Sequence, residues 1–253
     1  MRYPMITGHT GNDGTPYNSV ESVEKSISLG ADAFEVDVRR DENMTLVLSH
    51  DAKTQSIYDA CPRLEDVMEI ASHYPDIKIN CDLKDAELPL EVINLAKCFG
   101  IGADRLILTG TITPSFLSCH PEIVDKATIY INAECILEDI YMQKTKLDST
   151  QTQIQGYYDN PWKFLKSSFS CIDPYAGILA ETCVKHGVKG INIPYAVLTG
   201  ESINHFKKSG IPISVWTVDN KKDMTYLFSQ GIENLTTRCV KMAKSVRKEL
   251  LGY

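Results

Sequence analysis

The chain has no long apolar run, no excess of basic residues and no paired-cysteine motif. None of its apolar stretches approaches the roughly 20 residues of a membrane-spanning helix, so we do not expect stable insertion into a membrane. Its 33 acidic residues outnumber its 26 Lys and Arg, and the net charge of −7 disfavours general binding to nucleic acid or to anionic membranes. The eight cysteines are scattered, which argues against a disulfide network.

The sequence also lacks the features that usually divide a chain into parts: it has no low-complexity segment, no Pro/Gly-rich linker and no internal repeat. The first residues lead into a short strand-like run without the apolar core of a signal peptide, so we expect a cytoplasmic protein. With 253 residues, 43% of them hydrophobic, the composition is that of an ordinary globular protein. We therefore expect a single domain spanning residues 1–253.

A short β-rich run followed by an amphipathic helical pattern recurs along the chain. Glycines stand just after several of the predicted helices, where a left-handed cap residue is favoured. The eight predicted strands cover residues 4–8, 32–38, 77–83, 105–109, 127–131, 187–193, 211–218 and 232–236. Eight strand–helix units in about 250 residues predict the α/β class and a closed (β/α)8 barrel, the TIM barrel.

Two segments interrupt this alternation. Residues 45–50 form an extra strand soon after the second, which predicts a hairpin. Residues 147–173 form a long polar and aromatic insert between the fifth and sixth strands of the barrel. Its aromatic residues either cover the rim of the barrel or belong to a helix packed on the outer wall; they are Tyr157, Tyr158, Trp162 and Phe164.

Acidic residues end two neighbouring strands of the predicted barrel. Glu35 and Asp37 share one face of the second strand, and Asp82 and Lys84 share one face of the third. Active sites of these barrels lie at the C-terminal ends of the strands. Three carboxylates that converge there repel one another unless a cation offsets their charge, and all-oxygen ligands favour Mg²⁺ or Ca²⁺. The alternative is that each carboxylate is paired with a neighbouring basic residue.

Two histidines lie next to these acidic residues in the predicted site. His9 follows the first strand and His50 ends the extra hairpin. Histidine gains and loses a proton near neutral pH, so the pair can serve as general acid and general base. Lys84 provides a positive charge for an anionic substrate. The remaining histidines lie in helical or loop contexts that favour a surface or packing role.

Taken together, these motifs resemble those of the glycerophosphodiester phosphodiesterases, metal-dependent hydrolases with a (β/α)8 barrel. The family's His-Arg-Gly motif corresponds to His9-Thr10-Gly11, and its Glu-Asn-Thr motif to Tyr17-Asn18-Ser19. Its Gly-Ala with Glu-x-Asp corresponds to Gly30-Ala31 with Glu35-Val36-Asp37. Its His-Asp and Glu-x-Lys motifs correspond to His50-Asp51 and Asp82-Leu83-Lys84. Two later stretches are also similar, Val215-Trp216-Thr217-Val218-Asp219 and 231–237. The resemblance spans the whole chain and is densest over residues 9–84 and 210–237.

The resemblance implies a role for each site residue. His9 and His50 correspond to the acid–base pair, and Glu35, Asp37 and Asp82 to the ligands of one divalent cation. Lys84 is implied as a phosphate contact and Trp216 as part of the pocket wall. The implied activity is hydrolysis of a small-molecule glycerophosphodiester to glycerol 3-phosphate and an alcohol, which would make the chain a phosphoric diester hydrolase.

Several positions depart from the family pattern. Thr10 replaces an arginine that contacts phosphate, Tyr17 replaces a glutamate, and Asp82 is shorter than the usual glutamate. The stretch that follows His50 is too short for the small subdomain that many members insert after the second strand. Arg238 stands where the family has an aspartate.

Arg238 offers a replacement for the missing arginine. In a closed barrel the last strand lies about 5 Å from the first, so Arg238 should stand beside the loop that holds Thr10. An arginine there can bind phosphate with two parallel hydrogen bonds. The alternative is that Arg238 only opens the basic helix that follows.

Other functions stay open at this point. A related lyase or phospholipase would form a cyclic phosphate, and a barrel that has lost turnover would only bind a phosphodiester. An unrelated barrel aldolase or isomerase is a third alternative, against which the motif around Trp216 counts. The sequence does not specify the leaving alcohol, the identity of the metal, the individual roles of the two histidines or the oligomeric state.

Overall fold

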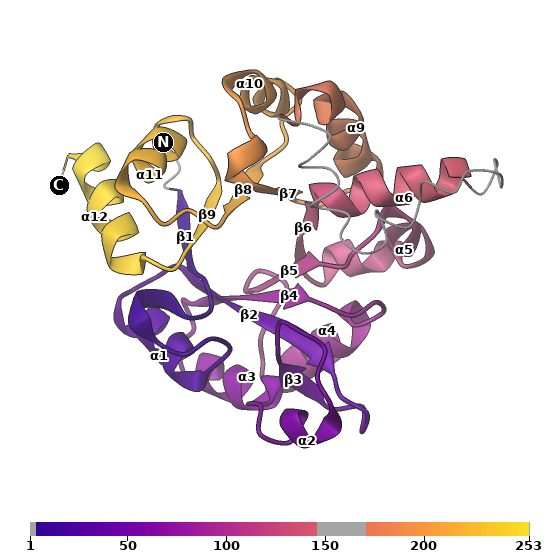
Figure 1. Ribbon diagram of the computed structural model, residues 1–253, viewed down its shortest axis with the longest axis vertical. Coiled ribbons are helices and arrows are strands. Elements are labelled where there is room, and N and C mark those ends of the chain that lie inside the picture. The colour runs from indigo at the N-terminus through magenta and orange to yellow at the C-terminus, as the bar shows by residue number, and fades with distance from the viewer. Residues whose placement is uncertain (1–3, 146–170, 253) are drawn as a thin grey trace.

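The structure, a computed structural model, describes residues 4–145 and 171–252. Eight parallel strands close into a barrel, because β1 pairs with both β9 and β2. Figure 1 shows the strands at the centre with the helices around them. The barrel strands are β1 (Met5–Gly8), β2 (Ala33–Arg40), β4 (Lys78–Leu83), β5 (Leu106–Gly110), β6 (Thr128–Asn132), β7 (Gly190–Pro194), β8 (Ile213–Trp216) and β9 (Asn234–Thr237). The predicted TIM barrel is confirmed.

Helices follow the strands and cover the outside of the barrel. They are α1 (Val20–Ser28), α3 (Leu64–Ser72), α4 (Pro89–Cys98), α5 (Pro114–Cys119), α6 (Ala133–Thr145), α9 (Ala176–His186), α10 (Gly200–Lys208), α11 (Lys221–Ser229) and α12 (Val240–Leu251). Short 3₁₀ turns accompany them at Asn12–Gly14, Pro121–Asp125, Asp173–Tyr175 and Tyr195–Val197. None of the helices in the described ranges is long and apolar enough to span a membrane.

The extra strand β3 (Leu46–Leu48) lies outside the barrel and pairs antiparallel with the end of β2. This is the predicted hairpin. The short helix α2 (Gln55–Tyr58) follows it and takes the place of any larger inserted subdomain, as the short spacing before Pro62 predicts. His50, which follows β3, lies near the C-terminal ends of the barrel strands, beside His9 and Asp82 in one cavity lining.

Most apolar side chains of the barrel wall and of the inward faces of the helices form one large core, and Met5, Ala33, Ile107 and Tyr130 form a second, small cluster. Valine and isoleucine dominate the strands, as β-branched residues do on a pleated, buried surface. Val36, Val38, Ile79 and Ile191 are at most 1% exposed. In α1, Ser19 caps the helix by accepting a hydrogen bond from the Ser22 amide at 3.1 Å.

The polar residues of the strands point the other way, into the barrel. A belt of buried amide and hydroxyl side chains crosses its interior; it comprises Thr7, Asn80, Thr109, Asn132, Asn192, Ser214 and Asn234. Hydrogen bonds between neighbouring strands satisfy these groups, as burial requires. The barrel therefore has an apolar layer between its strands and the helices, and a belt of polar side chains inside it.

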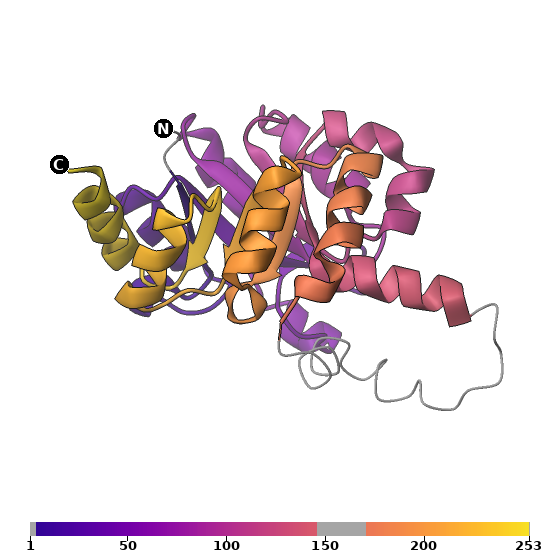
Figure 2. The same ribbon diagram turned by 90° about the horizontal axis from the view of Figure 1, so that it is seen from above.

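Most expected elements agree with the structure to within a few residues. Helices α5 and α6 follow β5 and β6, as the strand–helix alternation predicts, and α2 after the hairpin is outside that alternation. The aromatic residues Tyr157, Tyr158, Trp162 and Phe164, for which two placements were open, lie outside the described residues. Figure 2, which views the barrel from the side, shows the N- and C-terminal ends lying at the same end of the molecule. This agrees with β1 and β9 being neighbours in the closed barrel.

Candidate active site

A cavity of about 730 Å³ opens at the C-terminal ends of the strands. The strands of a TIM barrel present catalytic side chains at this end. All eight site residues predicted from the sequence line this cavity: His9, Glu35, Asp37, His50, Asp82, Lys84, Trp216 and Arg238. The structure thus brings together residues that are up to 229 positions apart, from His9 to Arg238.

Three carboxylates meet on one wall of this cavity. Glu35 and Asp37 project from β2, and the strand register places Asp82 of β4 opposite Asp37. One oxygen of each carboxylate lies within 4.8 Å of the others. Glu35 and Asp37 are 4% and 2% exposed, so water screens their charges little.

Lys84 bridges two of these carboxylates. Its Nζ lies 2.8 Å from Asp37 Oδ1 and 2.6 Å from Asp82 Oδ2. Although burial opposes the charged form, the two carboxylates raise the pKa of Lys84, so the ammonium stays charged. One ammonium offsets only one of the three possible negative charges.

Burial and the uncompensated negative charge both raise the pKa of Glu35. Burial raises its pKa to about 7, Asp37 and Asp82 add to the rise, and His9 opposes it. A divalent cation would supply the charge that the cluster lacks, and three carboxylates with no sulfur donor suit a hard ion such as Mg²⁺ or Ca²⁺. The residues present therefore fit the cation that the sequence predicts.

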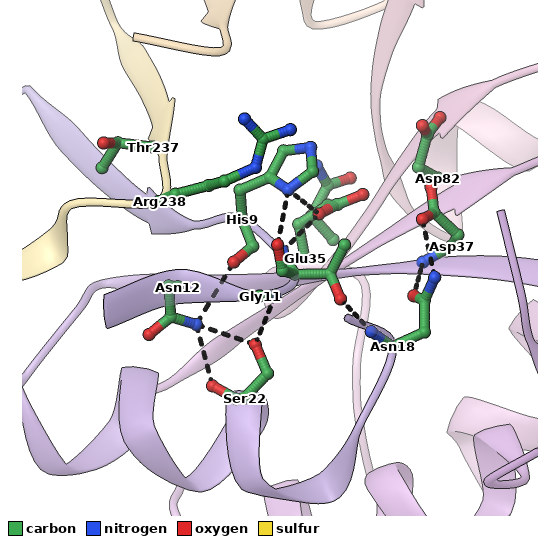
Figure 3. A network of polar contacts seen from close by, with 12 residues as sticks. His9, Gly11, Asn12, Asn18, Ser22, Glu35, Asp37, Asp82, Thr237 and Arg238 are labelled. Atoms are coloured by element: carbon green, nitrogen blue, oxygen red, sulfur yellow. Dashed lines mark hydrogen bonds and ion pairs between the residues drawn. The ribbon is translucent and has the colours of Figure 1, made fainter. Parts of the chain in front are cut away.

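Asn18 holds the carboxylate wall in place. Its side-chain amide donates to Asp37 Oδ2 at 2.9 Å, and its Oδ1 accepts from the Asp37 backbone amide at 3.0 Å (Figure 3). Asn18 has a φ of 50°, in the left-handed region that asparagine tolerates better than most residues. Ser19, and not Asn18, caps α1, and this leaves the Asn18 side chain free to bind Asp37.

Asn12 anchors the loop that carries His9. Its side-chain amide donates to the Ser22 carbonyl, Ser22 Oγ and Ser26 Oγ, each at 2.9 Å, and to the His9 carbonyl at 3.2 Å. The residue is fully buried. The Gly11 amide also donates to Ser22 Oγ, at 3.0 Å, so Asn12 and Gly11 together tie the loop after β1 to α1 (Figure 3).

The hydrogen bonds of His9 define its tautomer. Its Nδ1 lies 2.8 Å from the Thr10 carbonyl oxygen and 3.7 Å from Glu35 Oε2. A carbonyl oxygen only accepts, so Nδ1 carries the hydrogen, and a neutral His9 has its lone pair on Nε2. His9 is 17% exposed at the cavity wall, which suits a general base or acid.

His50 stands at the mouth of the cavity, with 66% of its side chain exposed. Its Nδ1 lies 2.9 Å from Asp51 Oδ1. The hydrogen bond and charge of His50 lower the pKa of Asp51, so the ionised carboxylate accepts from Nδ1. Both histidines thus have Nδ1 engaged and Nε2 available.

Arg238 lies beside the loop that lacks an arginine. The register of β1 and β9 pairs Gly8 with Thr237, and the Asp13 amide donates to the Arg238 carbonyl at 2.7 Å. The guanidinium is 5.5 Å from the centre of the Tyr17 ring, and its Nη1 lies 3.2 Å from Asp219 Oδ2.

Figure 3 shows the Arg238 side chain reaching toward His9. Its Nε is buried and has no partner among the described residues. Thr10 itself is turned inward: it is 1% exposed, its Oγ1 accepts from the Asn18 amide, and its own amide donates to Glu35 Oε2 at 3.0 Å. The predicted position of Arg238 next to the Thr10 loop is correct.

Sequence reasoning missed the residues that position the site and one that lines it. Asn12 and Asn18 are not residue types that indicate catalysis from sequence alone, although Asn18 lies within a motif that matches the family. Glu134 lines the cavity from the first turn of α6, the helix that follows β6. Its position directly after a strand end is the signal that could have identified it.

The amino-acid sequence is similar to that of a known phosphodiesterase. Over 240 residues the chain is 21% identical to a glycerophosphodiester phosphodiesterase of Caldanaerobacter subterraneus subsp. tengcongensis, covering 92% of this chain and 93% of that protein. No family model matches the chain. The resemblance to the glycerophosphodiester phosphodiesterases is confirmed.

Solved structures agree with this resemblance at the level of the fold. A putative glycerophosphoryl diester phosphodiesterase from Silicibacter pomeroyi superposes with a TM-score of 0.69 at 12% identity, covering 98% of this chain and 94% of that one. A phosphodiesterase from Oleispira antarctica, solved with the product sn-glycerol-3-phosphate, gives a TM-score of 0.66 at 16% identity and covers 96% of each chain. These phosphodiesterases and the present chain share the closed barrel along almost their whole length.

Proposed function

We propose that the chain is a phosphoric diester hydrolase, a single domain over residues 1–253, that cleaves a glycerophosphodiester to glycerol 3-phosphate and an alcohol. The observation that carries the proposal is the convergence of three carboxylates, one lysine and two histidines on one cavity. The whole-length similarity to a glycerophosphodiester phosphodiesterase supports it. So does the similar fold of a phosphodiesterase that holds glycerol 3-phosphate.

Glu35, Asp37 and Asp82 would hold one divalent cation, Mg²⁺ or Ca²⁺. Such a cation polarises phosphoryl oxygens and offsets the charge that builds up on them during cleavage. Asn18 keeps the Asp37 carboxylate oriented, and the Thr10 amide does the same for Glu35. These hydrogen bonds preorganise the ligand set, so less reorganisation is needed when the cation binds.

Lys84 and Arg238 bind the phosphate of the substrate. The Lys84 ammonium is a compact charge next to the carboxylates, and the Arg238 guanidinium approaches from the β9 side. Asp219 and the Tyr17 ring hold the guanidinium in place. Arg238 thus takes over the contact that an arginine at position 10 would make, and Trp216 forms part of the cavity wall.

His9 and His50 carry out the proton transfers. One of them removes a proton from the attacking water, and the other donates a proton to the leaving alcohol. Each presents Nε2, because Thr10 and Asp51 engage the Nδ1 atoms. The difference in exposure places His9 inside the cavity and His50 at its mouth.

The experiment that tests this function is a panel of glycerophosphodiesters incubated with Mg²⁺, Ca²⁺ or EDTA. We expect release of glycerol 3-phosphate with a divalent cation and none after chelation. Release of a cyclic phosphate as the final product would assign the chain to the lyase reaction instead. Tight binding of the diesters without any product would mean that the barrel only binds them.

A further inference from the structure

Glu134 is a carboxylate of the cavity that the proposed chemistry does not use. It lies in the first turn of α6 and lines the cavity. Its Oε1 accepts a hydrogen bond from the Asn132 side-chain amide at 2.8 Å. Its Oε2 is buried and has no partner among the residues that the structure describes.

A directed chain of hydrogen bonds holds this carboxylate. It starts on β1, crosses the inside of the barrel, and every member donates to the next at 2.8–3.0 Å. Its members in order are Thr7, Asn234, Ser214, Asn192, Asn132 and Glu134. The first five are at most 7% exposed. Because each link fixes which group donates at the next, Asn132 presents its NH₂ group to Glu134.

This series of hydrogen bonds determines how the Glu134 carboxylate is oriented. Glu134 is the final acceptor, so the hydrogen bond from Asn132 favours its charged form and fixes its orientation. Burial acts in the opposite direction and raises the pKa of Glu134 to about 7. A cation placed against Oε2 would both satisfy the free oxygen and offset the cost of burying the charge.

Glu138 extends this acidic wall. It lies four residues after Glu134, one turn along the same face of α6, and it also lines the cavity. Lys84, His9 and Arg238 line the cavity as well and supply positive charge or hydrogen-bond donors for a phosphate. The cavity is therefore lined by groups that suit an anion and by two carboxylates that suit a cation.

A second metal ion does not fit the Glu134 wall. Among the described residues, the group of three or more potential ligand atoms within 4.8 Å of one another is that of Glu35, Asp37 and Asp82, and Glu134 is not part of it. A divalent cation needs more ligands than Glu134 and Glu138 provide. An organic ammonium needs only a nearby negative charge and a hydrogen-bond acceptor.

We propose that Glu134, assisted by Glu138, binds an ammonium group on the leaving alcohol, so that the preferred substrate is a glycerophosphodiester of a primary amino alcohol. This inference rests on the proposed function. A primary ammonium donates the hydrogen bond that Glu134 Oε2 lacks, whereas a quaternary ammonium has no N–H and a neutral alcohol has no charge. The order of preference is therefore primary ammonium, then quaternary ammonium, then neutral alcohol.

The test compares kcat/KM for glycerophosphoethanolamine, glycerophosphocholine and glycerophosphoglycerol in the cation-loaded enzyme. We expect the ethanolamine diester to exceed the glycerol diester by about 10-fold or more, the size of one charge-assisted contact. Glu134→Gln keeps the shape of the side chain and should reduce the ratio of kcat/KM for the ethanolamine diester to that for the glycerol diester about 10-fold. Glu138→Gln should reduce it by a smaller factor.

Glu181→Gln is the matched control, because Glu181 is exposed on α9 and does not line the cavity. It should leave the ratio unchanged. A ratio near 1 in the unaltered enzyme, or an equal loss for all three diesters in Glu134→Gln, would overturn the inference while leaving the hydrolase function intact. Failure to hydrolyse any of the three diesters would instead overturn the proposed function. The ratio is informative for any variant that retains activity, and Glu134→Asp provides a second variant if Glu134→Gln does not fold.

Discussion

At the scale of single residues, the sequence indicates which groups gather at the site but not how each is held. His9, Glu35 and Asp37 follow from their places at strand ends. The roles of Asn12 and Asn18 do not, because their partners lie on elements whose packing the sequence does not specify. The tautomer of His9 likewise depends on a backbone carbonyl that only the folded loop presents.

The carboxylates provide the first prediction at this scale. Asp37→Asn should reduce kcat below detection, since it removes a ligand charge while keeping the shape of the side chain. Calorimetric titration with Mg²⁺ or Ca²⁺ should show a matching loss of affinity. Asp76→Asn, an exposed change outside the cavity, serves as the control. Undiminished turnover in Asp37→Asn would contradict the proposed cation site.

The histidines provide the second prediction. His9→Ala and His50→Ala should each lower kcat by about 10²–10⁴-fold, the usual contribution of a general acid or base. If the two act as one unit, the double variant should be little slower than either single variant. Single-turnover rates measure this directly. A single variant with full activity would remove that histidine from the mechanism.

The third prediction concerns Arg238. Arg238→Ala should raise KM, lower kcat/KM by about 10-fold or more, and leave the fold intact, because it removes a charge-assisted phosphate contact. Steady-state kinetics with a glycerophosphodiester provide the measurement. Unchanged kinetics in Arg238→Ala would show that the guanidinium only packs on Tyr17 and Asp219.

At the scale of elements, the regular units were predictable and the irregular ones were not. Strands such as β2 and β7 were predicted because apolar and polar side chains alternate along them, as they do on the two faces of a strand. Helix α2 is only four residues long, and α6 has a weak apolar face, so neither has a clear helical period. Helix α6 carries Glu134 and Glu138, so these two cavity residues could not be found from the helical pattern.

Asn12 supplies a prediction at this scale, since it joins the loop after β1 to α1. Asn12→Ala leaves buried acceptors on both elements without their donor and should lower the free energy of unfolding by about 1–3 kcal/mol. Denaturant titration is the measurement. Ser28→Ala, which removes an exposed side-chain hydrogen bond in α1, should cost much less. Equal stability of the two variants would mean that the loop does not depend on this amide.

At the scale of the whole molecule, the barrel gathers acidic groups at one end, and this affects its stability. In cation-free protein, burial raises the pKa of Glu35 from 4.5 to about 7. Between these values the unfolded chain releases a proton that the folded chain retains. The free energy of unfolding should therefore fall as pH rises from about 4.5 to 7, by on the order of 3 kcal/mol, and then level off.

Glu35→Gln isolates this effect, because glutamine does not titrate. The free energy of unfolding of the variant and of the unaltered protein is measured by denaturant titration from pH 4.5 to 8. As pH rises, the variant should become increasingly more stable than the unaltered protein. Saturating Mg²⁺ or Ca²⁺ should abolish the decline in the unaltered protein. A stability difference that does not change with pH would contradict the assigned cause.

The central claim is that this barrel hydrolyses a glycerophosphodiester with the help of a divalent cation. Phosphorus NMR of a reaction with glycerophosphoethanolamine tests it most directly, because diester, cyclic phosphate and monoester give separate signals. We predict that the diester signal is replaced by that of glycerol 3-phosphate with Mg²⁺ or Ca²⁺, that EDTA stops the conversion, and that restored cation restarts it. Conversion at full rate in chelated protein, or a diester signal that persists under every condition, would contradict the account.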